Sequence, residues 1–157
     1  MSGEPVDPDG GLSVPARRAE STGTGRWAVL GAIAVGGAAG ATARHGAEVL
    51  WPVPAGGFPW AVLGVNLLGC ALIGVLMPLV AEDGRSAYPL VRPFLGVGVL
   101  GGFTTFSTYA LGTVGLLEHG RPGPALLYAA GTAAGALLAV AAAARLTRAV
   151  LGRGAVR

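Results

Sequence analysis

The apolar positions of this chain gather in four long runs, and short polar stretches separate them. The runs cover residues 27–43, 60–80, 90–117 and 124–144. About 20 helical residues are needed to cross the roughly 30 Å of hydrocarbon in a bilayer, and each run approaches or exceeds that length. The pattern predicts an all-α membrane protein with four transmembrane helices.

The third run contains a stretch that disfavours a continuous helix. Residues 100–112 read "LGGFTTFSTYALG", in which two glycines precede a cluster of Thr and Ser. Gly costs backbone entropy in a helix, and β-branched Thr loses rotamer freedom against the preceding turn. Because this run is also longer than a bilayer requires, we predict a third helix that is broken near the midplane. A glycine-induced kink filled by aromatic packing is the alternative.

Backbone groups freed by such a break must be buried in protein, line water or bind an ion. Carbonyl oxygens of Gly101, Gly102 and Thr104 would suit a hard cation such as Na⁺. The rings of Phe106 and Tyr109 suit the opposite charge, since the edge of an aromatic ring is its positive part. These two residues lie three apart, on one face of the resumed helix. The stretch is therefore a candidate ion-binding site.

Composition supports the membrane class and outlines three regions. Of 157 residues, 52% are apolar and 12% charged, and the mean hydropathy is +0.62. Residues 1–25 are rich in Gly, Pro, Ser and Asp, which predicts a disordered N-terminal tail. Residues 26–146 would form the transmembrane domain, and residues 147–157 a short basic C-terminal tail. All eleven basic residues are Arg and lie near the ends of the runs without interleaved aromatics, so no nucleic-acid partner is expected.

The polar side chains within or at the end of a run each have a structural and a functional interpretation. Asn66 either ties two helices by a hydrogen bond or offers amide N–H groups to an anion. Arg44 either pairs with Glu48 at a helix end or raises the local anion concentration at a vestibule. Tyr128 and Thr132 share one helix face, which fits either an interhelical hydrogen bond or a polar track.

No Asp, Glu, Lys or Arg lies in the interior of any run. A proton-coupled exporter of cationic compounds normally needs a buried acid, so this absence argues against one. Small residues are frequent instead. Gly36 and Gly40 lie one turn apart in the first run, as do Gly131 and Gly135 in the fourth, and this spacing lets helix backbones approach closely in lipid. Cys70 is alone in the second run, and we interpret it as a small packing residue.

Three motifs carry a resemblance to a known family. "GGFTTFSTYA" in the third run, "GGAAGATARH" at the end of the first and "VNLLGCALIG" in the second together resemble the CrcB/Fluc family of small fluoride channels. The resemblance covers roughly residues 27–145. It implies an antiparallel dimer of the dual-topology type with two fluoride pathways. It also implies a central structural Na⁺, which is not transported, held by the backbone carbonyls of Gly101 and Thr104.

The resemblance also assigns residues to the fluoride pathway. The candidates are Arg44, Asn66, Phe106, Thr108, Tyr109, Tyr128 and Thr132. Two positions depart from the family pattern. Tyr109 stands where Phe is usual, and Ala136 ends the track begun by Tyr128 and Thr132 without a hydroxyl group.

The function predicted from these observations is a channel that passes F⁻ passively down its gradient and relieves cytoplasmic fluoride toxicity. Fluoride is strongly hydrated, so a narrow pore must replace its water with hydrogen-bond donors and positive ring edges. No covalent chemistry and no redox cofactor are expected. A small ion-coupled exporter and a non-conducting membrane assembly subunit are the alternatives.

The arginines predict how the chain is oriented in the cell membrane. With four spans, both termini and the middle loop share one side, and nine of the eleven Arg residues fall there. Only Arg44 and Arg121 fall on the other side. Because positive residues favour the cytoplasm, both termini are expected to be cytoplasmic in one fixed orientation. The expected partner is then a paralogous subunit inserted the opposite way.

Overall fold

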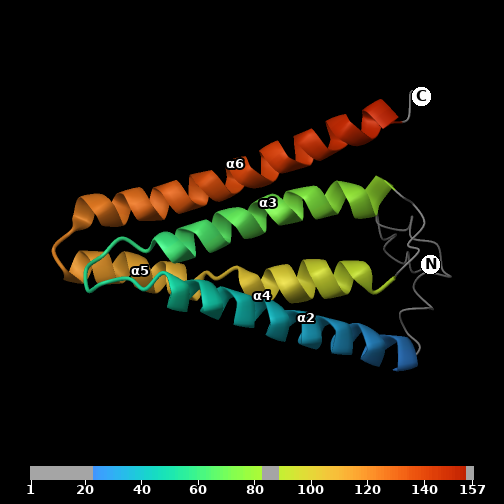
Figure 1. The fold of residues 1–157 in the computed structure, drawn as a ribbon, viewed down its shortest axis with the longest axis horizontal. Coiled ribbons are helices and arrows are strands. Elements are labelled where there is room, and N and C mark those ends of the chain that lie inside the picture. Colours follow the sequence, from blue (N-terminus) through green and yellow to red (C-terminus); the bar gives the residue numbers. More distant parts are fainter. Residues whose placement is uncertain (1–22, 83–88, 155–157) are drawn as a thin grey trace, which may run out of the picture.

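A computed structural model describes residues 23–82 and 89–154, and every regular element within them is helical (Figure 1). The elements in chain order are α2 (Gly23–Leu50), α3 (Trp60–Glu82), η1 (Arg92–Leu100), α4 (Gly101–Phe103), α5 (Ser107–Glu118) and α6 (Pro122–Gly154). The segment η1 is π-helical, and η1, α4 and α5 follow one another along the third span. The all-helical prediction is confirmed.

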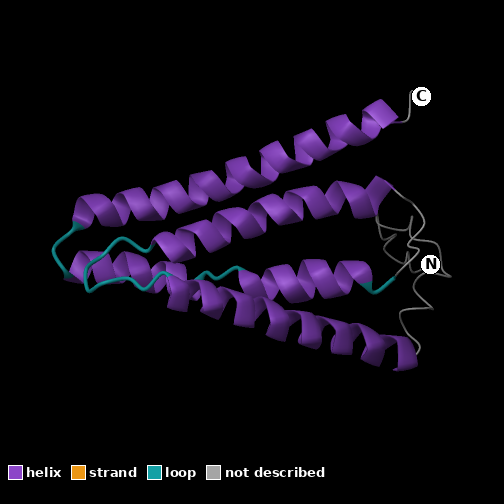
Figure 2. Cartoon of the chain, viewed as in Figure 1, coloured by secondary structure: helices purple, strands orange, loops and turns teal. Residues whose placement is uncertain are grey.

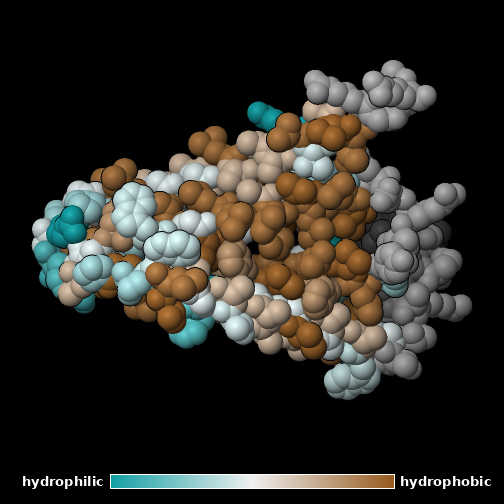
Figure 3. All heavy atoms as spheres, in the orientation of Figure 1, coloured by the Kyte–Doolittle hydropathy of each residue, from teal (hydrophilic) through white to brown (hydrophobic). Residues whose placement is uncertain are grey.

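Four helical stretches are long and apolar enough to cross a bilayer. They are Gly25–Leu50, Trp60–Val80, Arg92–Glu118 and Pro122–Gly152. Apolar residues cover much of the described face in Figure 3, and hydrophilic residues gather at the end where α5 turns into α6. Large apolar side chains such as Leu137 and Leu138 point outward, as expected where lipid is the solvent. The structure therefore agrees with the prediction of four transmembrane helices.

The third span is not one continuous helix (Figure 2). Helix α4 ends at Phe103, Thr104 adopts an extended conformation with φ −77° and ψ 155°, and α5 begins at Ser107. The N–H of Thr104 still donates to the carbonyl of Leu100 at 3.0 Å, so helical bonding stops at this residue. Residues 104–106 are therefore non-helical backbone inside an apolar span, and we call them the interruption.

Helix α2 packs against η1 and α4 through glycines. A Cβ atom added at Gly36 or Gly40 would collide with backbone atoms of η1, including the carbonyl of Val99. Gly102 of α4 meets the carbonyl of Gly37 in the same way. A larger residue at any of these positions would force the backbones apart, which supports the close packing predicted from the glycine spacing.

Helices α3 and α6 lie side by side and run in the same direction (Figure 1). A Cβ atom added at Gly74 of α3 would lie 2.5 Å from the carbonyl of Val140, and one at Gly135 of α6 would lie 2.8 Å from the side chain of Leu67. Residues of α6 therefore lie beside residues of α3 whose numbers are 66 to 68 lower. With this offset, polar residues of α3 lie beside polar residues of α6 at the same height along the two helices.

Two helices extend beyond their predicted ends. Helix α2 continues through Arg44 and Glu48 to Leu50, past the end of the first apolar run at residue 43. Charged residues lower local hydropathy, but a pair spaced i, i+4 is compatible with a continuing helix. Helix α6 continues to Gly154, into the predicted basic tail. The predicted disordered tail falls mainly on residues 1–22, which lie outside the described residues.

Candidate functional site

Asn66 of α3 bonds both backbone groups of Thr105 in the interruption. Its Oδ1 accepts the N–H of Thr105 at 2.9 Å, and its Nδ2 donates to the carbonyl of Thr105 at 3.0 Å. The residue is only 8% exposed. A donor and an acceptor on one amide thus replace the partners that a non-helical residue loses. Asn66 has the interhelical bonds that its structural interpretation predicted, and one of its amide N–H groups lies outside them.

The interruption leaves backbone carbonyls, among them those of Gly101 and Thr104, without their helical partners. In an α-helix, the N–H of Thr105 would bond the carbonyl of Gly101. The N–H of Thr108 would likewise bond the carbonyl of Thr104. Here the first N–H goes to Asn66, and the second goes to Oγ1 of Thr105 at 3.2 Å. A Cβ atom on Gly101 would meet nothing within 4 Å, so the chain leaves space beside this carbonyl-bearing residue.

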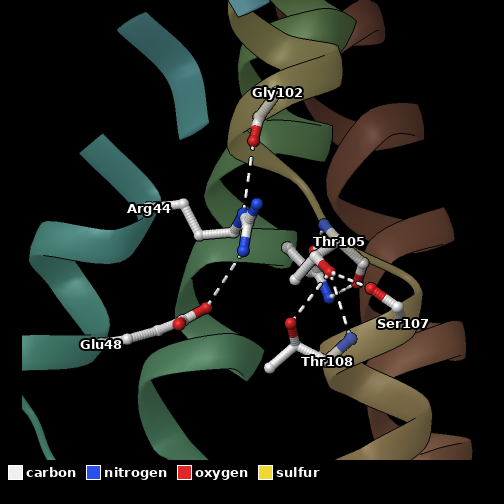
Figure 4. A network of polar contacts seen from close by, with 7 residues as sticks. Arg44, Glu48, Gly102, Thr105, Ser107 and Thr108 are labelled. Carbon is white, nitrogen blue, oxygen red and sulfur yellow. Dashed lines mark hydrogen bonds and ion pairs between the residues drawn. The ribbon is translucent and has the colours of Figure 1, made fainter. Parts of the chain in front are cut away.

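Hydroxyl groups complete the start of α5 (Figure 4). Oγ1 of Thr105 lies 3.1 Å from Oγ1 of Thr108 and 3.3 Å from Oγ of Ser107. Together with the bond from the N–H of Thr108, these contacts satisfy polar groups that a helix start leaves free. The Thr and Ser residues that disfavour a continuous helix therefore also supply hydrogen bonds to the backbone that leaves it.

A cavity of about 320 Å³ borders the interruption. Its lining residues come from α3, the interruption, α5 and α6, and they are Asn66, Cys70, Thr104, Thr105, Phe106, Tyr109, Thr132, Ala133 and Ala136. None of these side chains is charged. The rings of Phe106 and Tyr109 lie 5.6 Å apart, and Phe106 is 79% exposed within the chain. The structure thus brings together four predicted pathway residues, namely Asn66, Phe106, Tyr109 and Thr132.

The hydroxyl group of Tyr109 has a partner, whereas two neighbouring hydroxyl groups do not. Tyr109 donates to the carbonyl of Ala129 on α6 at 3.0 Å, and its ring lies 5.5 Å from that of Tyr128. Tyr128 and Thr132 are 0% and 5% exposed, and neither hydroxyl has a hydrogen-bond partner among the described residues. An unsatisfied buried hydroxyl costs about 1–3 kcal/mol. Of the two, Thr132 lines the cavity, and Tyr128 lies behind Tyr109.

Arg44 and Thr108 lie outside this cavity. Arg44 donates from Nε to the carbonyl of Gly102 at 3.3 Å, and its Nη1 lies 3.4 Å from Oε1 of Glu48 (Figure 4). The predicted pairing of Arg44 with Glu48 is therefore present, in the last two turns of α2. Thr108 and Glu48 border a second cavity, of about 360 Å³, which is lined mainly by the connection between α2 and α3, the start of α3, and α5. Arg44 thus joins the first helix to the third span.

Sequence reasoning missed two residues of the site. Thr105 was not assigned a role, although its backbone is the partner of Asn66 and its hydroxyl organises the start of α5. Cys70 was interpreted as packing alone, although it lines the cavity. Its i, i+4 spacing from Asn66 was the signal that could have placed it on the same helix face.

Comparison with known proteins identifies the family. A family model described as "CrcB-like protein, Camphor Resistance (CrcB)" matches residues 31–144. A protein of Streptomyces coelicolor named fluoride-specific ion channel FluC 1 is 54% identical over 123 residues, which are 78% of this chain and 79% of that protein. FluC 2 of Streptomyces avermitilis is 50% identical over 126 residues, or 80% and 78% of the two chains. The resemblance inferred from the three motifs is confirmed, and the chain belongs to the CrcB-like protein family.

Proposed function

We propose that this chain forms a channel through which F⁻ passes down its gradient across the cell membrane. The observation that carries the proposal is the uncharged cavity at the interruption. It combines an amide, two aromatic rings and a hydroxyl group that has no hydrogen-bond partner within the described part of the chain. The relatives from both Streptomyces species are named fluoride-specific ion channels, which agrees with this chemistry.

The cavity lining suits a small, strongly hydrated anion. Such an ion gives up water only where the protein offers donors in its place. The remaining amide N–H of Asn66 and the hydroxyl of Thr132 are donors, and the rims of Phe106 and Tyr109 carry partial positive charge. Each contact is weak. The ion can therefore move from one contact to the next and leave, as conduction requires.

The other predicted residues would support this path from outside the cavity. Arg44 would hold α2 to the carbonyl of Gly102 and so keep the first helix against the third span. Tyr128 would fix the ring of Tyr109 by packing against it. Thr108 would complete the start of α5.

The two alternative functions are less well supported. An ion-coupled exporter would need an acid in its transport path to exchange a proton for substrate. Glu48 lies within a span, but it pairs with Arg44 and borders a different cavity from Asn66. A non-conducting subunit would have no use for donors and ring edges around one cavity.

The direct test is fluoride efflux from liposomes that contain the purified full-length protein, followed with a fluoride electrode. We expect efflux well above that of protein-free vesicles, either from this chain alone or after co-expression with a paralogue. No efflux in either preparation would refute the channel and favour the non-conducting subunit.

Phe106→Ile should remove most of the flux. The substitution keeps an apolar side chain of similar reach but removes the positive ring edge. Loss of about 1.4 kcal/mol of ion stabilisation, near the upper range for an aromatic contact, lowers a rate roughly tenfold. Because Phe106 is 79% exposed within the chain, folding should be preserved, which size-exclusion chromatography checks. Unchanged flux from a well-folded variant would mean that the ring only packs.

Asn66→Asp should make the flux depend on pH. The ionised carboxylate cannot donate to the carbonyl of Thr105 and repels an anion, so flux should fall by orders of magnitude above the carboxyl pKa. Below that pKa the protonated acid can both accept from and donate to Thr105, so flux should recover as pH falls. Efflux is measured across pH, with the HF leak of protein-free vesicles subtracted. A pH-independent loss would point to misfolding instead.

We also propose that the working assembly is an antiparallel dimer with a central Na⁺ where the interruptions of two chains meet, near the midplane. The carbonyls of Gly101 and Thr104 fit such an ion, because their helical donors are engaged elsewhere and the space beside Gly101 is open. Within residues 23–82 and 89–154, no cluster of three or more His, Cys, Asp or Glu side chains could hold a metal. The ion would supply positive charge that offsets the carbonyl dipoles.

Gly101→Leu should abolish assembly and flux while the single chain still folds. The Cβ atom of the new side chain meets nothing within 4 Å in its own chain, so we expect its effect to come from the space where the ion and the partner would lie. Gly31→Leu is the matched control, since a Cβ atom at Gly31 also meets nothing within 4 Å. Assembly and flux are measured with Na⁺ present and with Na⁺ replaced throughout purification. Normal flux without Na⁺ would exclude the central ion.

Both termini are proposed to face the cytoplasm. One end of the bundle, where α2 begins and α6 ends, carries five of the described arginines: Arg26, Arg92, Arg145, Arg148 and Arg153. The other end carries Arg121, and Arg44 lies within α2. The bias towards one end supports a single orientation. An antiparallel partner would then be a paralogous subunit inserted the opposite way.

Reporter fusions at the C-terminus should give signal only with a reporter that is active in the cytoplasm. We expect this because most arginines lie at the end of the bundle that carries both termini, and positively charged residues favour the cytoplasmic side. Comparable signals from cytoplasmic and periplasmic reporters would indicate dual topology. Strong flux from the single purified chain would likewise indicate a homodimer.

A further inference from the structure

Cys70 lies one helical turn from Asn66 and lines the same cavity. The two residues are spaced i, i+4 on α3, and α6 contributes Thr132 and Ala136 with the same spacing. Because α6 residues lie beside α3 residues numbered 66 to 68 lower, Cys70 is at the level of Ala136. At this level α6 offers only a methyl group, and the hydroxyl of the nearby Thr104 is bonded to the carbonyl of Leu100. The thiol of Cys70 is therefore a polar group of the lining that is available here.

Thr132, one helical turn before Ala136 on α6, indicates that this side of the cavity faces a polar group. Thr132 is 5% exposed, lines the cavity, and its Oγ1 has no hydrogen-bond partner among the described residues. Buried hydroxyl groups are almost always satisfied by protein, water or ligand. Water or an anion that satisfied Thr132 would occupy the same space that Cys70 borders.

We propose that the Cys70 thiol forms part of the wall of the ion pathway, where it donates a weak S–H contact, and that a small thiol reagent blocks the pathway there. This inference rests on the proposed channel function. A weak donor suits a site that must release its ion. Only the thiolate reacts with such reagents, and it forms where water reaches the sulfur. A thiol that faces lipid should therefore react much more slowly than Cys70.

Methyl methanethiosulfonate is a suitable reagent because it is small and neutral. Cys70 loses its proton to water, and the thiolate attacks the divalent sulfur of the reagent, not the sulfonyl sulfur. A mixed disulfide forms, the S–S bond of the reagent breaks, and methanesulfinate leaves with the electron pair. The thiol is oxidised, and the reagent is the oxidant. The added methylthio group then occupies part of the cavity.

The test uses the full-length protein in liposomes, with each sample compared with its own untreated flux. Wild type should lose most of its flux as mass spectrometry records one modification. Cys70→Ser contains no thiol and should be insensitive to the reagent. Leu72→Cys in the Cys70→Ser background is the matched control, since Leu72 is 44% exposed and does not line this cavity. Its thiol should react slowly, and its modification should leave flux unchanged.

A second variant pair tests the donor role. Cys70→Ala should lower flux, and Ala136→Ser in the same chain should restore it by returning a donor to that level. Failure of this rescue in folded proteins would overturn the donor role.

Full modification of Cys70 with unchanged flux would overturn the blocking site, and so would reagent sensitivity in Cys70→Ser. If no untreated protein conducts, the channel function fails. The modification rates then decide about Cys70 separately, because equal rates at positions 70 and 72 would mean that Cys70 does not face the cavity water.

Discussion

The two hydrogen bonds between Asn66 and the backbone of Thr105 are the constraint on which the site depends. An unsatisfied N–H or C=O group in hydrocarbon costs several kcal/mol, so a helix cannot open in a membrane without replacement partners. A side-chain amide has both a donor and an acceptor, and Asn66 supplies one of each to a single residue. Once Thr105 is held in this way, its hydroxyl oxygen can accept a hydrogen bond from the N–H of Thr108. Because these two N–H groups are bonded elsewhere, the carbonyls of Gly101 and Thr104 lose their helical donors.

Helix α2 covers the other side of the third span, away from the cavity, and it packs there through close contacts at glycines. Gly36 and Gly40 bring α2 against the backbone of η1, and Gly102 brings α4 against α2. At this separation the side chain of Arg44 reaches the carbonyl of Gly102. Helix α2 therefore closes one side of the span by backbone contact, while α3, α5 and α6 border the cavity.

Much of this arrangement could be predicted from the sequence, and the remainder depends on tertiary geometry. The apolar runs predicted the four spans, because hydrophobic length is a local property. The first helix extends beyond its apolar run, because hydropathy does not register that Arg44 and Glu48 pair on one helix face. Glycine and threonine content marked the place where the third helix stops. The partner of that interruption could not be found locally, since Asn66 and Thr105 are 39 residues apart.

The cavity is not lined by charged side chains, as expected for a path from which an ion must be released. At an effective dielectric constant of 20, a full positive charge 4 Å from an anion contributes about 4 kcal/mol of attraction. That attraction would slow release roughly a thousandfold. Arg44 is instead bonded to Gly102 and Glu48, and the cavity lining is neutral. Hydroxyl, amide and ring-edge contacts are each much weaker than a full charge, so a succession of them can remove water from fluoride without holding the ion.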